Sequence, residues 1–318
     1  MTIITIDRDS PQRKQIVILT EVKSISTLHL RLSQMPVNAR SPHPKRPLSQ
    51  LLILLALAAF TAVAAIHFYP DLTTVFQTPQ SIATPPPEIE NILKGKRKIV
   101  TVGDSITEAG KYTGGYVWLL QNYLNALYPS QKIEIINAGI SGNKSTDMQA
   151  RFQKDAIAKN PDLITINVGV NDVWLAFFDF RTNQVHPEGN LPAGVPLAVY
   201  RQKLTEMVRS AQAAGIRVAL LSPTPIREVL HGPENRRLPE YMAVMRQIAI
   251  ENNCLYIDLN SPFREVLIAF QKHAGRSLNL LTRDGVHPNL AGNRIIAYTI
   301  LRGLGISEKD IQSVQVKY

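Results

Sequence analysis

The chain has 318 residues, of which 45% are hydrophobic and 19% are charged, and this composition excludes an intrinsically disordered protein. Its single cysteine, Cys254, excludes an intrachain disulfide framework. The net charge of +10 is uneven, because the first fifty residues hold 8 Lys/Arg and only 3 Asp/Glu. Apart from KGKRK at 94–98, the other basic residues are scattered, so we expect no nucleic-acid binding.

The N-terminal part of the chain predicts a membrane anchor. Residues 1–50 form a basic segment that we expect to be disordered, and residues 1–34 have no clear element. Residues 51–69, LLILLALAAFTAVAAIHFY, contain no Asp, Glu, Lys or Arg. About nineteen helical residues span roughly 28 Å, close to the hydrocarbon thickness of a bilayer. Basic residues precede this stretch, so a single transmembrane signal-anchor helix would leave the C-terminal bulk outside the cytoplasm.

A second interpretation of the same stretch is a cleaved signal peptide, with Ala62-Val63-Ala64 as its cleavage site and a secreted product. A start at Met35 would give that peptide a normal basic region. The apolar run is long for a signal peptide, which favours the anchor. Residues 70–93, rich in Pro and Thr, are predicted to be an extended linker that holds the following domain away from the membrane.

From residue 94 onward, predicted strands alternate with predicted helices. Apolar runs predict strands at 98–103, 132–139, 161–172 (a strand followed by a loop), 216–225 and 254–259. Helical spacing predicts helices at 115–128, 145–160, 197–215, 233–253 (with Pro239 marking a start or a break) and 289–304. This alternation predicts an α/β fold with a parallel sheet covered on both faces. Active sites in such sheets lie beyond the carboxyl ends of the strands.

Polar motifs stand at those strand ends and before the last helix: GDS (103–105), NAGISGN (137–143), GVND (169–172), SPTP (222–225) and DGVHP (284–288). Taken alone, GDS favours a helix-cap role for Ser105 over a nucleophile. A serine nucleophile needs an adjacent base, and the base needs an orienting carboxylate. The loop Asp284-x-x-His287 can bring the carboxylate to imidazole Nδ1 and leave Nε2 for the serine.

Acyl transfer also needs hydrogen-bond donors for the developing oxyanion. Gly142 can offer a backbone N–H with no side chain in the way, and Asn171 carries an amide donor. Asp104 and Asp172 are interpreted as structural hydrogen-bond acceptors for nearby backbone.

Four blocks, G-D-S-I-T, N-A-G-I-S-G, G-V-N-D and D-G-V-H-P, resemble the SGNH (GDSL-like) hydrolases over roughly residues 95–305. The resemblance implies a flavodoxin-like three-layer α/β/α sandwich with a central five-stranded parallel sheet, here residues 94–318. It implies Ser105 as nucleophile, His287 as base and Asp284 as its orienter. It further implies an oxyanion hole made of the Ser105 N–H, the Gly142 N–H and the Asn171 side chain. The resemblance implies neither a metal nor an organic cofactor.

The expected function is therefore a serine esterase that acts through an acyl-enzyme on an O-acylated glycan or a lysolipid. An acyltransferase to a carbohydrate hydroxyl would use the same residues, and a non-catalytic glycan-binding domain is an alternative from another class. The expected partners are the ester substrate and, through residues 51–69, a membrane. The long segment 173–200 is either a lid beside the nucleophile or a packed loop, and the sequence leaves both open.

Overall fold

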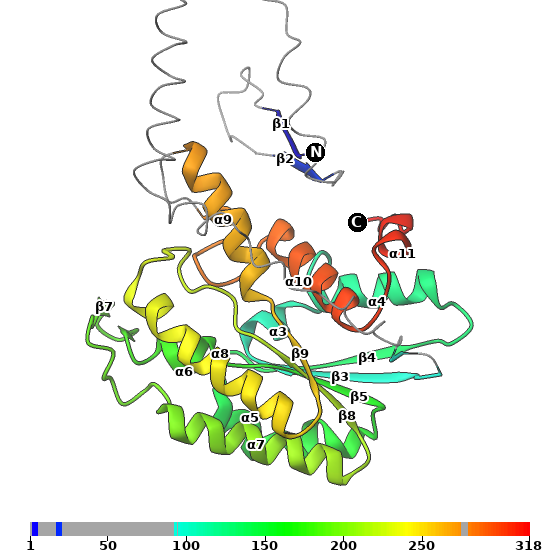
Figure 1. The fold of residues 1–318 in the computed structure, drawn as a ribbon, viewed down its shortest axis with the longest axis horizontal. Coiled ribbons are helices and arrows are strands. Elements are labelled where there is room, and N and C mark those ends of the chain that lie inside the picture. Colours follow the sequence, from blue (N-terminus) through cyan, green and yellow to red (C-terminus); the bar gives the residue numbers. More distant parts are fainter. Residues whose placement is uncertain (1, 6–16, 21–91, 94, 275–278) are drawn as a thin grey trace, which may run out of the picture. The chain divides into compact units, whose positions relative to one another are not determined.

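The computed structural model describes residues 2–5, 17–20, 92–93, 95–274 and 279–318 (Figure 1). The chain divides into two compact units, Met1–Pro87 and Glu88–Tyr318. In the first unit, strand β1 (Thr2–Thr5) pairs antiparallel with strand β2 (Val17–Thr20), where the sequence pattern assigns no element.

The predicted anchor at 51–69 lies outside the described residues, as do most of the basic segment and nearly all of the linker. Among the helices that are described, none is long and apolar enough to cross a membrane. The anchor, its cleaved alternative and the boundaries at 50 and 69 therefore stay predictions.

A five-stranded parallel sheet forms the centre of the second unit, with the order β4-β3-β5-β8-β9. The first strand along the chain lies between the second and the third, as in flavodoxin-like sheets. The predicted parallel sheet is confirmed, and each strand lies within its predicted range: β3 (Lys98–Gly103), β4 (Glu134–Gly139), β5 (Leu163–Asn167), β8 (Arg217–Leu221) and β9 (Leu255–Ile257).

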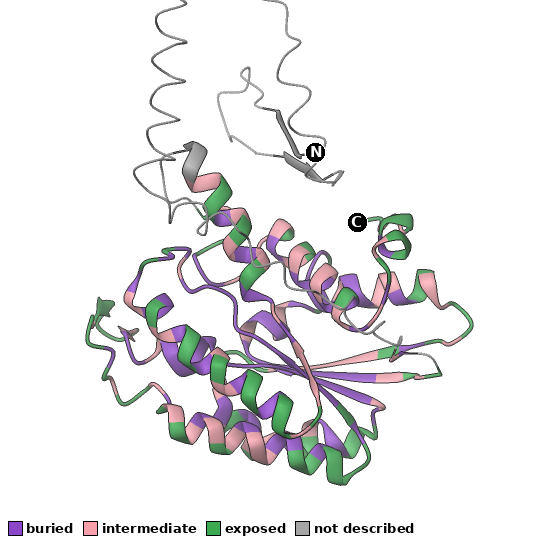
Figure 2. Cartoon of the chain, viewed as in Figure 1, coloured by how far each residue is buried: buried purple, intermediate pink, exposed green. Residues whose placement is uncertain are grey.

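Helices cover both faces of this sheet, so its central strands are buried (Figure 2). Figure 1 shows α4 and α10 on one face and α5, α7 and α8 on the other. All five correspond to predicted helices: α4 (Tyr116–Leu127), α5 (Ser145–Asp155, followed by a 3-10 turn at Ile157–Lys159), α7 (Leu197–Ala213), α8 (Pro233–Glu251) and α10 (Leu290–Gly303).

Several elements differ from the sequence-based expectation. The segment after β5 was predicted as a loop but forms the short helix α6 (Val170–Trp174), and Pro239 lies inside α8 rather than at its start. Helix α9 (Asn260–Ala274) follows β9 in a stretch with no assigned element, and its first turn is capped by Asp258, whose Oδ1 accepts the Asn260 N–H at 2.9 Å. The remaining elements without a predicted range are α3 (Ser105–Ala109), β6 (Phe178–Asp179), β7 (Gln184–Val185) and α11 (Glu308–Ser313).

Candidate active site

Ser105 is the first residue of helix α3 (Ser105–Ala109), which follows β3 after a single intervening residue, Asp104. The Asp104 carboxylate caps this helix, because its Oδ1 accepts the Ile106 N–H at 2.9 Å. Burial raises the pKa of Asp104 to about 7, since the side chain is only 1% exposed. The interpretation of Asp104 as a backbone acceptor is confirmed, and the cap holds Ser105 at the carboxyl end of β3.

Ser105, His287 and Asp284 form one continuous hydrogen-bonded chain. His287 Nε2 lies 2.8 Å from Ser105 Oγ, and His287 Nδ1 lies 2.6 Å from Asp284 Oδ2. The other carboxylate oxygen, Oδ1, accepts the N–H groups of Val286 at 3.0 Å and His287 at 2.8 Å. Asp284 therefore closes the loop and orients the ring with the same carboxylate. With Nδ1 protonated toward Asp284, Nε2 is left to accept the serine proton.

Opposing influences act on the Asp284 carboxyl. Partial burial raises its pKa, but the hydrogen bonds from the His287 backbone and ring and from the Val286 N–H outweigh burial. The pKa of Asp284 therefore lies below its usual value, and the carboxylate stays ionised beside the imidazole. The side chains of His287 and Asp284 are 30% and 55% exposed, so this part of the site is open to solvent.

The two other predicted donors are linked through the turn that follows β4, which contains Gly142 and bonds to Asn171. Gly142 has φ +78°, a conformation that favours glycine, and a Cβ there would meet nothing within 4 Å. Asn171, on α6 and 7% exposed, donates one amide hydrogen to the Asn143 carbonyl at 3.0 Å, and its second amide hydrogen has no acceptor among the described residues. Within the described part of the chain, the N–H groups of Ser105 and Gly142 bond to no acceptor.

Glu108 joins α3 to the turn that carries Gly142. Its carboxylate accepts the Ser141 N–H at 2.8 Å and also the Ser141 hydroxyl in a short hydrogen bond. The hydroxyl contact is the main reason that the pKa of Glu108 lies below its usual value. Sequence reasoning missed this residue, although its position three after Ser105 puts both on one helix face.

Arg151, on α5, was also missed, and its helical pattern gives no signal of its role. The guanidinium donates to the carbonyls that end two neighbouring strands, Gly103 at 3.0 Å and Ala138 at 2.8 Å. Its Nε donates to the Asn143 side chain at 2.7 Å. One cation thus ties the end of β3, the end of β4 and the turn after β4 into a single unit.

Asp172 fixes the start of α5. Its buried carboxylate accepts the Ser145 N–H at 3.0 Å and the Ser145 hydroxyl at 2.5 Å, so its predicted structural role is confirmed. Burial raises the pKa of Asp172 to about 6. Asp172 is next to Asn171 on α6. Its contact with Ser145 therefore also holds α6 against the start of α5, which follows the turn after β4.

Glu228 supports the loop that carries Asp284 and His287. It is 1% exposed, and its carboxylate accepts the N–H groups of Leu280 at 2.7 Å and Leu281 at 2.9 Å and the Thr282 hydroxyl at 2.5 Å. The Thr282 oxygen in turn accepts the Gly285 N–H at 3.0 Å. No sequence motif links Glu228 to this loop, which explains why the pattern gave no indication of it.

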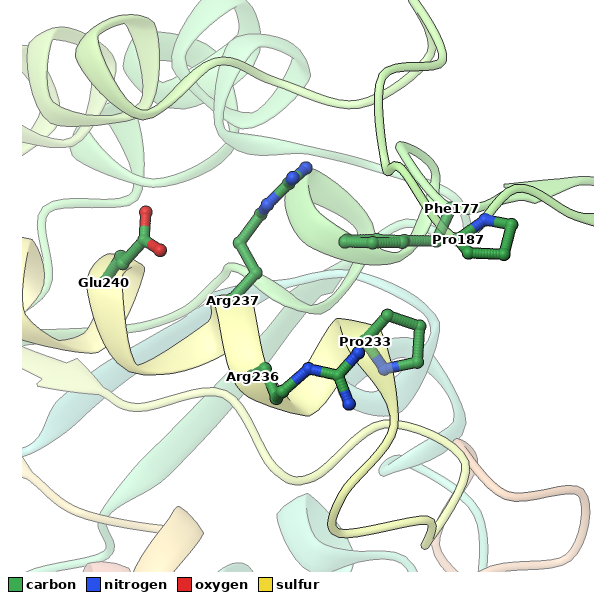
Figure 3. Close-up of a pocket in the computed structure, with 6 residues that line it drawn as sticks. All are labelled: Phe177, Pro187, Pro233, Arg236, Arg237 and Glu240. Carbon is green, nitrogen blue, oxygen red and sulfur yellow. The ribbon is translucent and has the colours of Figure 1, made fainter.

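The segment 173–200 is anchored at its base to α8. The Tyr241 hydroxyl donates to the Val195 carbonyl at 2.5 Å, and Arg237 donates to the Glu188 carbonyl at 3.1 Å. The Arg237 guanidinium also lies 4.5 Å from the centre of the Phe177 ring (Figure 3). These contacts favour the packed-loop interpretation for the base of the segment.

An open cleft of about 230 Å³ lies beside this anchor, between the segment and α8 (Figure 3). It is lined by Phe177, Pro187, Pro233, Arg236, Arg237 and Glu240. None of the predicted site residues lines it, so the ester chemistry is not assigned to this cleft.

Comparisons with known proteins agree on the family. The model of the GDSL-like Lipase/Acylhydrolase family matches residues 101–295. An acetylxylan esterase from Geobacillus stearothermophilus is 33% identical over 219 residues, which cover 65% of this chain and 94% of that protein. Esterase TesA from Pseudomonas aeruginosa is 28% identical over 196 residues, covering 61% and 80%.

Solved structures give the same result. The crystal structure of the Geobacillus acetylxylan esterase matches with a TM-score of 0.56 and 33% identity, covering 66% of this chain and 95% of that chain. Catalytic mutants of that enzyme, in which a histidine, a serine or an aspartate is replaced by alanine, match with TM-scores of 0.57, 0.56 and 0.56. The matched region contains Ser105, Gly142, Asn171, Asp284 and His287. The chain belongs to the GDSL-like lipase/acylhydrolase family and is a carboxylic ester hydrolase.

Proposed function

We propose that this protein is a serine esterase that removes short acyl groups, acetyl foremost, from an acylated glycan outside the cytoplasm. The hydrogen-bonded chain from Asp284 through His287 to Ser105 carries the proposal. The acetylxylan esterase of Geobacillus supports it, because its catalytic mutants replace the same three residue types. In that enzyme the aspartate precedes the histidine by three positions, as Asp284 precedes His287 here.

The first half of the reaction is acylation of Ser105. Its Oγ bonds to the acyl carbon while His287 Nε2 takes the hydroxyl proton, and the carbonyl electron pair moves onto oxygen. Asp284 stabilises the imidazolium that results. Collapse of the tetrahedral intermediate breaks the bond to the sugar oxygen, which leaves with the proton from Nε2. The products are an acyl-serine and a free glycan hydroxyl.

The second half is hydrolysis of the acyl-serine. Water attacks the acyl carbon, and His287 Nε2 takes a proton from it. When the second tetrahedral intermediate collapses, Ser105 Oγ leaves and recovers its proton from the imidazolium. The carboxylic acid departs, so one ester and one water give one acid and one alcohol.

Three donors are proposed to hold the oxyanion in both halves: the Ser105 N–H, the Gly142 N–H and the second amide hydrogen of Asn171. Neither backbone N–H bonds to an acceptor within the described residues, so both are available to substrate. Glu108 and Arg151 would position this group through the turn after β4. Losing one such donor typically lowers the rate about 10²- to 10³-fold.

The exposure of the site favours a short acyl group on a polymer. With His287 30% and Asp284 55% exposed, a glycan chain can lie across the surface and present its ester. A long acyl chain would need an enclosed apolar channel, because each CH₂ gains about 0.8 kcal/mol only when it is buried. The predicted anchor at 51–69 supports a location outside the cytoplasm, where such polymers are found.

Hydrolysis of p-nitrophenyl acetate and octanoate by the full-length protein tests the chemistry. We expect acetate to be preferred, and Ser105→Ala and His287→Ala to lower kcat by at least about 10³-fold. Ser210→Ala, at an exposed serine of α7, is the matched control and should retain full activity. Equal turnover by Ser105→Ala and wild type would overturn the proposal, and preferred hydrolysis of octanoate would overturn the short-acyl part.

Topology needs a separate measurement. A reporter fused after Tyr318 that is active only outside the cytoplasm should be active in cells that express the fusion. A reporter that is active only inside should be silent, and the reverse pattern would overturn the proposed location.

A further inference from the structure

Three aromatic side chains after the proposed oxyanion residue form an aromatic cluster, defined here as Trp174, Phe178 and Phe180. The rings of Trp174 and Phe178 are stacked, with centroids 5.7 Å apart and an interplanar angle of 22°. Phe180 meets both edge-on, at 5.0 Å from Trp174 and 4.8 Å from Phe178. Yet the Phe180 side chain remains 59% exposed, so the cluster is not a closed core.

This aromatic cluster begins on the helix that carries the proposed oxyanion residue Asn171. Trp174 stands three residues after Asn171 on α6, and residues at that spacing lie on one helix face about 5–6 Å apart. From Trp174 the chain continues into the β6–β7 hairpin, which lies at the edge of the second unit (Figure 1). The rings therefore follow Asn171 directly, on the helix that carries it and on the hairpin after that helix.

The polar groups beside the rings suit a neutral, hydroxyl-rich ligand. The hairpin carries one anion and one cation, Asp179 and Arg181, and these two pair at 3.7 Å. The hydroxyl and amide side chains of residues 182–184 are exposed at its tip. A membrane surface would be matched by unpaired basic residues, which this hairpin lacks. Partly exposed rings rimmed by hydrogen-bonding side chains are instead typical of a ligand-binding surface.

The base of the hairpin is held in place before any ligand arrives. Arg237 covers the Phe177 ring and bonds to the Glu188 carbonyl, and the His186 N–H donates to the Phe177 carbonyl at 2.7 Å. Ordering a loop on binding costs affinity, so a hairpin anchored in this way is already organised for binding.

We propose that the aromatic cluster is a binding subsite for a neutral saccharide chain. It would hold sugar units next to the one whose ester reaches Ser105. The apolar C–H face of a sugar ring packs on Phe180 and Trp174, while its hydroxyls bond to the polar side chains at the hairpin tip. This inference rests on the proposed function. It adds binding energy for a saccharide chain that a small ester such as p-nitrophenyl acetate lacks the sugar units to gain.

The first test compares two substrates. For the full-length protein, Phe180→Ala should lower the ratio of kcat/KM for an acetylated xylooligosaccharide to kcat/KM for p-nitrophenyl acetate about tenfold, chiefly through KM. Phe180→Tyr keeps a ring and should restore the ratio. Ile250→Ala, at a 69% exposed apolar residue near the end of α8, is the control and should leave the ratio unchanged.

The second test measures binding without turnover, by calorimetry with the same xylooligosaccharide. Adding Phe180→Ala to Ser105→Ala should weaken the Kd about tenfold. An unchanged Kd would overturn the subsite even where the esterase reaction stands. If the wild-type protein hydrolyses no ester, a weakened Kd would support the subsite and refute the proposed function. A changed sedimentation coefficient for Phe180→Ala would assign the rings to a subunit interface and overturn the proposal.

Discussion

Asp104 places a titrating carboxyl in the core, directly before the proposed nucleophile. Its Oδ1 accepts the Ile106 N–H, and burial raises its pKa from the ordinary 3.8 to about 7. The substitution Asp104→Asn keeps the capping oxygen, since Asn and Asp cap helices equally well, but removes the titration. The variant therefore separates the hydrogen bond from the cost of burying a charge.

The sign follows from the raised pKa. The stabilising contribution of the neutral carboxyl is complete below pH 3.8, and it is lost as the pH rises through about 7. Between pH 5 and 7 the unfolded chain has lost this proton and the folded chain keeps it. Because each pH unit in that interval costs about 1.4 kcal/mol, wild type should lose roughly 2–3 kcal/mol of unfolding free energy through Asp104.

Thermal unfolding followed by circular dichroism at pH 5 and pH 8 measures this effect. For a domain of this size, 2–3 kcal/mol corresponds to about 5–10 °C in Tm. Asp104→Asn should therefore gain about 5–10 °C relative to wild type between pH 5 and pH 8. Asp310→Asn, at an exposed carboxyl of α11, should follow wild type at both values. If the Tm difference between Asp104→Asn and wild type is the same at both pH values, the buried-carboxyl reasoning is refuted.

Two further predictions concern carboxylates that position the site. Glu228→Gln replaces one acceptor oxygen by a donor, so one hydrogen bond to the segment before the Asp284–His287 loop is lost. A hydrogen bond to a charged group contributes about 1.5–3 kcal/mol, so Tm should fall by several degrees. The value of kcat should fall as well, because this segment supports the loop. Glu240→Gln, at an exposed position of α8, is its control, and an unchanged Tm for Glu228→Gln would contradict the prediction. Glu108→Gln weakens the hold on Ser141, so kcat/KM for p-nitrophenyl acetate should fall about tenfold with little change in Tm. Because the hydrogen bond from Ser141 lowers the pKa of Glu108, the carboxylate should keep its hold on Ser141 as the pH falls below 4.5. Wild-type kinetics in the Glu108→Gln variant would refute this prediction.

The layered fold could be predicted because its signals are local. Each strand of the main sheet is a short apolar run ended by Gly, Pro or a polar residue, and the helices between them have regular apolar spacing. The short helix α6 could not be predicted in this way, since five residues after Gly169 are too few to give a periodic pattern. Helix α9 was not predicted, because the signal for its start is the capping residue Asp258 and not an apolar run.

At the site, the sequence indicated the groups that bond directly to one another but not those that hold them. Asp284 and His287 belong to one short loop, and their contact with Ser105 follows from where strands end. Glu228 and Arg151 act through backbone carbonyls and N–H groups, which every residue possesses. A contact of that kind leaves no side-chain pattern in its partner, so only the folded chain reveals it.

The proposed nucleophile and base are 182 positions apart, and this separation has a consequence for biosynthesis. During synthesis, Ser105, the turn that contains Gly142 and all five strands of the main sheet are made before His287. A growing chain can therefore contain every strand of its main sheet while it is still chemically inert. Docking of α10 completes the assembly, as the Tyr116 N–H bonds to Asn293 across 177 positions. A chain cut short after Thr282 would retain the sheet but lack the base, so incomplete molecules would not hydrolyse esters.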